Sequence, residues 1–110
     1  MIANRMMRLA VAATLLAAPL SLAAQKPGAV TPDYLIGRWG DNGDCSKDIH
    51  VFADGTFRSY TGGDGRWWLE GDQLTFEGSG GTFVMRVAYE GPDSMIITNP
   101  DGSVGRSQRC

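Results

Sequence analysis

Short turn motifs recur every eight to twelve residues through the second half of this chain. Aromatic and β-branched residues fill the intervals, which is the pattern of antiparallel strands joined by tight turns. Such hairpins bury their apolar faces by packing sheet on sheet or by closing into a barrel. The sequence therefore predicts an all-β fold. The turn motifs are Asp54-Gly55, Gly62–Gly65, Gly71-Asp72, Gly78–Gly81, Gly91–Asp93 and Asn99–Gly102.

Alternation of apolar and polar side chains defines the strands between these turns. The clearest hairpin has a two-residue turn at 71–72, so that Leu69 faces Leu74 and Trp67 lies near Phe76. We predict a small antiparallel up-and-down meander of seven or eight strands that forms a barrel. The expected strands cover residues 34–39, 45–53, 56–60, 66–70, 73–77, 82–90, 94–98 and 103–108.

A second hairpin is less regular. If residues 54–55 form a two-residue turn, Phe52 faces Phe57 and the two rings share one face of the sheet. Ile49 and Val51 then lie on the opposite face, so both faces of this strand would be apolar. A bulge before Phe52, or a strand that is covered on both sides, would remove the conflict.

The amino-terminal residues have the layout of a secretory signal peptide. Arg5 and Arg8 precede an uncharged stretch rich in Ala and Leu, residues 9–24, which ends in small residues. This stretch is shorter than the roughly 20 residues that a membrane-spanning helix needs, and it contains Pro19. We predict a signal peptide over 1–23 and no transmembrane segment after cleavage. The mature protein would be periplasmic or secreted.

Cleavage would leave one small domain. We expect a flexible arm over 24–33, which holds two prolines and a glycine, and a small β-barrel domain over 34–110. Thr31 or Asp33 could cap one helical turn through residues 34–36, or those residues could already be strand. The formal net charge of the chain is −2 and its basic residues are scattered singly, so no positive stripe is present to bind nucleic acid.

The chain has two cysteines, Cys45 and Cys110. An exported protein folds in an oxidising compartment, and an even cysteine count favours pairing, so we predict a disulfide bond between them. A redox pair or a metal site is disfavoured because the chain lacks Cys-x-x-Cys and has a single histidine. Strict up-and-down order places the two cysteines at opposite ends of the barrel, however. Either the last segment folds back, one segment is not a full strand, or the cysteines do not pair.

Residues with catalytic or metal-binding chemistry are few. The chain has no nucleophile elbow, no zinc-protease helix motif and no phosphate-binding glycine loop. We interpret His50, beside Asp48, as a structural residue rather than a general base. Asp41, Asn42 and Asp44 gather oxygen atoms that could ligate Ca²⁺, but their spacing fits a polar turn better. The sequence predicts no enzyme, no cofactor and no metal site.

Trp68 is the one candidate for a surface contact. The alternation of its strand points it outward, next to Arg66. An exposed tryptophan beside an arginine suits a protein or glycan contact. Alternatively, a covering loop or the amino-terminal arm shields the ring.

Gly37-Arg38-Trp39 near the first strand, followed by a β meander and an arginine in the last strand, resembles the Gly-x-Trp signature of lipocalin-like (calycin) barrels. The resemblance implies that Trp39 closes one barrel end and packs beneath a basic residue, for which Arg106 and Arg109 are the candidates. Most of the chain after its arm also resembles small exported proteobacterial proteins of unknown function. This likeness implies a fold and no activity.

The interior of the predicted barrel is expected to be nearly solid. With strands of about five or six residues, an eight-stranded closure leaves just enough room for side chains. Aromatic residues would take up most of that room, and we therefore expect no large ligand cavity. These residues are Phe52, Phe57, Trp67, Phe76, Phe83 and Tyr89.

A non-catalytic binding or interaction module is the leading hypothesis for function. Its partner would be an envelope or secreted protein, or a small apolar ligand held at the barrel mouth. One alternative is an inhibitor of an exported hydrolase, because bacterial metalloprotease inhibitors are calycin-like barrels with an inserting arm, which residues 25–33 resemble in position and flexibility. Another alternative is a structural envelope component.

Overall fold

The protein is an eight-stranded antiparallel β-barrel. The computed structural model describes residues 29–110, so the predicted signal peptide and the start of the predicted arm lie outside the described residues. Each strand pairs with its neighbours in the sequence, and the last pairs with the first to close the barrel. The predicted all-β up-and-down architecture is confirmed. The strands are β1 (Gly37–Asp41), β2 (Asp44–Val51), β3 (Thr56–Ser59), β4 (Asp64–Glu70), β5 (Gln73–Gly78), β6 (Gly81–Gly91), β7 (Ser94–Thr98) and β8 (Val104–Arg109).

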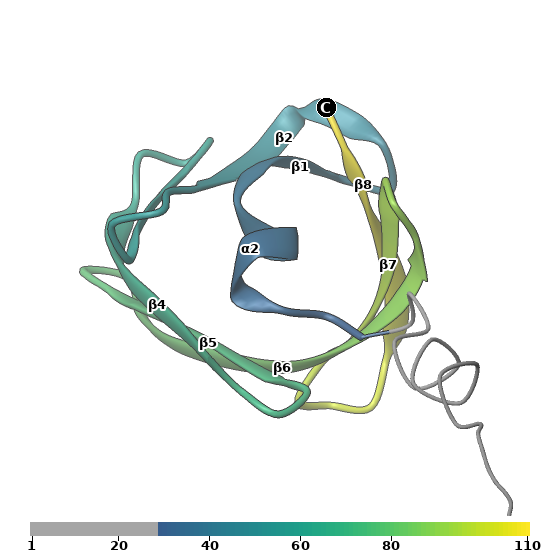
Figure 1. The fold of residues 1–110 in the computed structure, drawn as a ribbon. Coiled ribbons are helices and arrows are strands. Elements are labelled where there is room, and N and C mark those ends of the chain that lie inside the picture. Colours follow the sequence, from purple (N-terminus) through teal and green to yellow (C-terminus); the bar gives the residue numbers. More distant parts are fainter. Residues whose placement is uncertain (1–28) are drawn as a thin grey trace, which may run out of the picture.

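A single helical turn, α2 (Pro32–Leu35), precedes β1 and lies within the ring of strands in the view along the barrel (Figure 1). The Thr31 hydroxyl accepts a hydrogen bond from the Tyr34 N–H at 3.2 Å, and Pro32 starts the turn, where a missing N–H costs nothing. Of the two expectations for residues 34–36, the capped helical turn is correct. The first strand consequently begins at Gly37 rather than at residue 34.

The β4–β5 hairpin has the predicted register. Leu69 pairs with Leu74, and Trp67 pairs with Phe76, across a two-residue turn. Trp67, Leu74 and Phe76 are buried in the barrel, because alternate residues of a strand face the same side. The two-residue turn starts at Gly71, which has a φ of +62° that favours glycine.

The β2–β3 hairpin differs from the prediction by one residue. Val51, not Phe52, pairs with Phe57, because the loop holds three residues, 53–55. The Asp54 carboxylate accepts hydrogen bonds from the N–H and the hydroxyl of the residue that follows Gly55, and Gly55 has a φ of +88°. A turn that ends in a left-handed glycine is typical of three-residue hairpin loops.

This shift resolves the conflict over the two apolar faces of β2. A slip of one residue moves each side chain to the other face of the sheet. Ile49 and Val51 therefore share the inner side with Phe57, whereas Phe52 packs its ring against His50 with 4.1 Å between ring centroids. Neither a bulge before Phe52 nor a strand covered on both sides is needed.

The predicted disulfide bond between Cys45 and Cys110 is present, with 5.8 Å between the Cα atoms. The bond forms although all eight strands are present. The conflict between this disulfide and strict up-and-down order is therefore not resolved in any of the three ways that we expected. The β1–β2 ladder is irregular instead. Gly40 pairs with Asp48, the next residue of β1 pairs with the first residue of β2, and residues 45–47 have no partner in β1.

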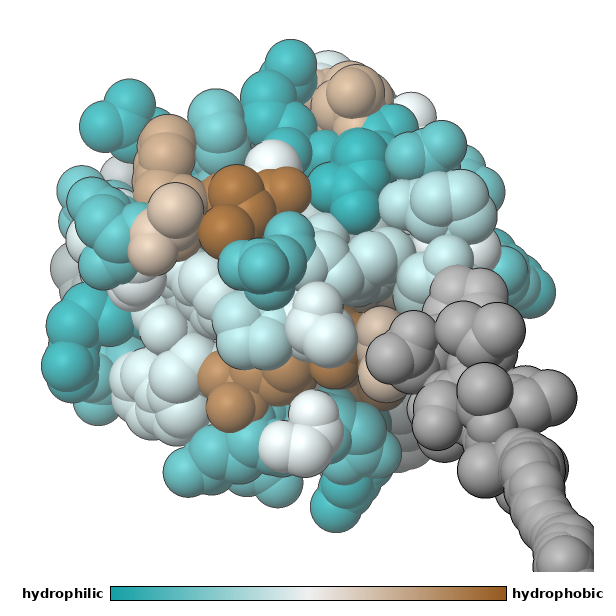
Figure 2. All heavy atoms as spheres, viewed as in Figure 1, coloured by the Kyte–Doolittle hydropathy of each residue, from teal (hydrophilic) through white to brown (hydrophobic). Residues whose placement is uncertain are grey.

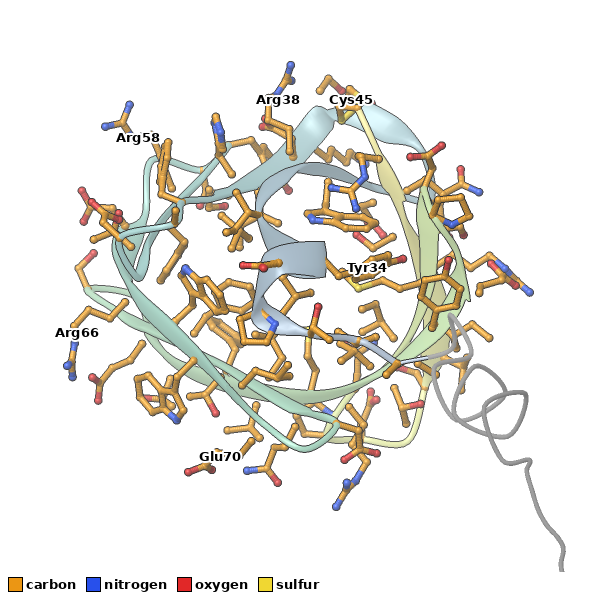
Figure 3. All side chains as sticks on the ribbon, viewed as in Figure 1. Tyr34, Arg38, Cys45, Arg58, Arg66 and Glu70 are labelled. Carbon is orange, nitrogen blue, oxygen red and sulfur yellow. A yellow bond between two sulfur atoms is a disulfide. The ribbon has the colours of Figure 1, made fainter. Side chains whose placement is uncertain are left out.

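The irregular β1–β2 ladder brings Cys45 next to Arg38. The Arg38 Nη2 donates a hydrogen bond to the Cys45 backbone oxygen at 3.3 Å, and the Arg38 backbone oxygen accepts one from the Cys110 N–H at 2.9 Å. Both cysteines therefore lie beside Arg38, where they are exposed to solvent (Figure 3). An irregular ladder commonly redirects a strand in this way.

The core lies mainly toward the α2 end of the barrel. Polar residues surround the outside of the ring, and apolar ones lie nearer the middle of the view (Figure 2). The buried apolar residues are Leu35, Trp39, Val51, Phe57, Trp67, Leu74, Phe76, Val87 and Met95.

Within residues 29–110, no helix combines the length and the apolar character that a membrane crossing requires.

Candidate functional site

Trp39 and Arg109 close the α2 end of the barrel. Trp39 is 1% exposed, and its indole N–H donates a hydrogen bond to the Leu35 backbone oxygen at 2.8 Å. The Arg109 guanidinium carbon lies 4.2 Å from the centre of the Trp39 ring system and 5.3 Å from that of Tyr34. Arg109 also donates to the backbone oxygens of Tyr34 at 2.9 Å and Ile36 at 3.1 Å. One cation thus joins α2 to β1 and β8.

Gly37 makes room for this cation. Its φ is +132°, and a Cβ atom there would lie 3.0 Å from the Arg109 Nη1. A side chain at this position would therefore strain the backbone and displace the guanidinium. Arg106, the other candidate partner of Trp39, instead forms an ion pair with Glu90 at 2.8 Å.

Tyr34 ties α2 to the β6–β7 turn. Its hydroxyl donates toward the backbone oxygens of Gly91 at 2.7 Å and Ser94 at 2.9 Å, and its ring lies 5.1 Å from that of Tyr89. Burial raises the pKa of the Tyr34 phenol, and the charge of Arg109 opposes this effect. The phenol is therefore a neutral donor at the closed end.

Above this closed end the barrel encloses a cavity of about 340 Å³ that opens at the other end. Leu35 and Trp39 form part of its floor. The expectation that side chains would fill the interior is wrong. The apolar wall residues are Ile49, Val51, Phe57, Leu74, Phe76, Met85, Met95 and Ile97.

Small side chains leave this space free. Gly78, Gly105, Ser59 and Ser107 all line the cavity, and the first three occupy the strand halves that lie away from α2. A Cβ atom built on Gly105 would meet no atom within 4 Å. The aromatic residues that we expected in the interior lie partly elsewhere, since Phe83 stands at the open end.

The open end, which we call the mouth, carries aromatic and charged side chains. Tyr60 and Phe83 are 56% and 59% exposed, and both line the cavity. Asp41, Lys47 and Asp64 line it too, and none of these three forms an ion pair with another residue in 29–110. The mouth therefore offers apolar surface and free charges to a molecule that enters.

Trp68 and Arg66 contact each other on the outer side of β4. The Arg66 guanidinium carbon lies 5.7 Å from the centre of the Trp68 ring system, and Arg66 also pairs with Glu77 at 2.6 Å. Trp68 is half-buried, and Thr75, its partner on β5, is buried although it lies on the same outer side. Trp68 therefore shields the sheet as well as facing solvent.

The remaining candidates are held by structural contacts. His50 is half-buried against Phe52. The Asp44 carboxylate accepts hydrogen bonds from the hydroxyl and the N–H of Ser46, which lower the pKa of Asp44. Asn42 accepts a hydrogen bond from the backbone N–H of residue 106. Among residues 29–110, no group of three or more His, Cys, Asp or Glu side chains is arranged to hold a metal ion.

Comparison with known proteins adds no assignment. No protein-family model, curated protein or solved structure matches this chain. Function is therefore inferred from the cavity, its closed floor and its mouth.

Proposed function

We propose that this protein is a non-catalytic binding protein that takes a small apolar ligand into the barrel through the mouth. The observation that carries the proposal is the cavity of about 340 Å³ between a closed floor and an open end. Small-molecule sites commonly have volumes of about 300–1,000 Å³ and apolar walls with a few polar groups at defined places. The walls and the mouth of this cavity fit that description.

The hydrophobic effect supplies the driving force in this proposal. Each methylene group that leaves water contributes about 0.8 kcal/mol, so a ligand of about ten carbons gains roughly 8 kcal/mol. Association costs at least about 4 kcal/mol in lost freedom of motion. The difference is at most about 4 kcal/mol, which corresponds to dissociation constants of about 1 mM or larger. Contacts to Lys47, Asp41 or Asp64 at the mouth would lower these constants.

We also propose that the protein acts in the periplasm or outside the cell. The signal-peptide pattern of residues 1–23 supports export. The Cys45–Cys110 disulfide supports it as well, because such bonds persist in oxidising compartments. The contact of Arg109 with Trp39 supports the resemblance to lipocalin-like barrels.

Fluorescence tests the binding proposal, because Trp39 lines the cavity. An uncharged dye, N-phenyl-1-naphthylamine, is titrated into the protein while dye and tryptophan emission are recorded. We expect a saturable rise in dye emission with one site per barrel and quenching of the tryptophan signal. Absence of saturable binding would favour a structural envelope component instead. An inhibitor that acts through its arm would lose potency when residues 25–29, which precede α2 and its Thr31 cap, are removed, with dye binding unchanged.

A matched pair of glycine variants locates the site. Gly105→Leu adds a side chain inside the cavity, whereas Gly91→Leu adds the same side chain outside it, and at neither glycine would a Cβ atom meet another atom within 4 Å. We expect Gly105→Leu to abolish dye binding with an unchanged circular dichroism spectrum, and Gly91→Leu to retain binding. Equal affinities of the two variants would place the dye elsewhere and contradict the proposal.

A further inference from the structure

The first half of β6 has an unpaired edge beside the mouth. Residues Gly81–Met85 pair with β5, but pairing of β6 with β7 begins only at Arg86, which lies opposite Thr98. Among the described residues, no hydrogen bond outside the strand ladders ends on the backbone of Gly81–Met85. The N–H and C=O groups on this side of β6 are therefore free to pair with another strand.

This edge lacks the features that usually protect one. Gly81–Met85 contains no charged residue and no proline. Phe83 is 59% exposed and Val84 is 37% exposed, so apolar side chains accompany the free backbone groups. Natural proteins commonly place lysine, proline or a covering loop at such a position. An uncovered apolar edge is typical of strands that pair with another chain.

A groove of about 290 Å³ adjoins the same edge and gives an added strand room. Val84, Met85 and Arg86 line one side of it, and Thr98–Pro100 line the other. Val104, which is 66% exposed and pairs with Thr98, lies on β8 and is not among the residues that line this groove.

We propose that Gly81–Met85 pairs antiparallel with the same segment of a second copy of this chain, so that two barrels join through β6. The segment suits its own copy, because in the register that sets Phe83 opposite Phe83 of the second copy, the two exposed rings pair and each Val84 lies opposite a Thr82. Arg86 then lies opposite Gly80, so no like charges meet. A two-fold axis repeats each contact and limits the assembly to a dimer.

This inference is independent of ligand binding and has its own test. Analytical ultracentrifugation of the mature protein from about 1 μM to about 1 mM covers the affinities that a short edge contact can give. We expect a monomer–dimer equilibrium. We also expect the amide protons of Gly81–Met85 to exchange more slowly with deuterium as the protein concentration rises.

Two valine variants separate the edge from the neighbouring surface. Val84→Lys sets charged side chains near each other across the two-fold axis, and we expect the dimer dissociation constant to rise about tenfold or more. Val104→Lys adds the same charge off the edge and should leave the constant unchanged. Thr82→Lys, at another exposed position of the edge, should repeat the effect if Val84→Lys does not fold. Val84 does not line the cavity, so dye binding by Val84→Lys should match the wild type.

A monomer at every concentration would overturn the proposal. So would a dimer that Val104→Lys weakens and Val84→Lys does not, or one in which the amides of Gly81–Met85 exchange as in the monomer. Slower exchange of these amides only after addition of another exported protein would assign the edge to a different partner and equally exclude the second copy.

Discussion

The two ends of this barrel are formed by the same strands but by different side chains. At the closed end, Trp39, Tyr34 and Arg109 fill the space with rings and a cation that is hydrogen-bonded to backbone oxygens. Toward the open end, residues such as Gly105 and Ser59 leave a cavity. Strand number sets the width of a small barrel, whereas the side chains at each level decide whether that width is filled.

The largest expected difference between the ends concerns aromatic residues. Trp39→Ala should lower the free energy of unfolding by about 3–5 kcal/mol, because it opens a cavity in the closed end and removes the contact with Arg109. Phe83→Ala, at the mouth, should change it by no more than about 0.5 kcal/mol. Urea unfolding followed by circular dichroism measures both values. Similar losses for the two variants would show that the mouth contributes to the core.

Loss of the disulfide should have the next largest effect. Replacing both Cys45 and Cys110 with alanine should cost about 2–4 kcal/mol, since the bond constrains a long loop of the unfolded chain. Because Cys110 follows Arg109, we expect amide exchange to increase at the closed end more than at the mouth. Thermal unfolding and deuterium exchange of the double variant measure the two effects. Uniformly faster exchange would contradict a special role for the bond at the closed end.

Glycines give a finer comparison of the two ends. Gly37→Ala should cost about 1–3 kcal/mol, because its φ of +132° is unfavourable for other residues and a Cβ atom would approach Arg109. Gly105→Ala adds the same methyl group to open space and should change stability by no more than about 0.5 kcal/mol. Urea titrations of both variants measure the free energies of unfolding. An unchanged free energy for Gly37→Ala would mean that the Arg109 guanidinium can move aside without loss of stability.

The smallest expected effect is a pH dependence of the closed end. The pKa of Tyr34 is raised in the folded protein, so its contribution to stability is complete below the ordinary tyrosine pKa of about 10 and is lost as the pH rises through the folded value. Stability between about pH 9 and 12 should therefore fall more steeply in the wild type than in Tyr34→Phe. Urea midpoints across this range measure the two slopes, and equal slopes would exclude Tyr34 as the source.

Alternation along the strands predicts which side of the sheet a residue faces, and this part of the fold could be derived from the sequence. The register of Leu69 and Leu74 followed from a two-residue turn. The same rule failed at residues 54–55, because the Asp54 carboxylate bonds to the backbone beyond Gly55 and stabilises a longer loop. An Asp followed two residues later by Thr was a visible signal for this geometry.

The cavity could not be predicted in the same way, because alternation does not give the height of a residue along the barrel. Phe83 and Tyr89 lie on the same face of β6, yet Phe83 lies at the mouth and Tyr89 packs against Tyr34 at the closed end. Height depends on how far each strand is staggered against its neighbours. The small residues Gly105 and Ser107 were the available sequence signal for a cavity. Their inward-facing positions indicate a cavity only once the stagger between neighbouring strands is known.

The glycines and serines that line the cavity have a practical consequence for protein engineering. Side chains of graded size at Gly105 or Ser107 can shorten the pocket stepwise, because neither residue takes part in the contacts among Trp39, Tyr34 and Arg109. The depth of the cavity and the packing of the closed end therefore depend on separate sets of positions. A library restricted to these two positions would vary the depth of the cavity while leaving the side chains of the closed end unchanged.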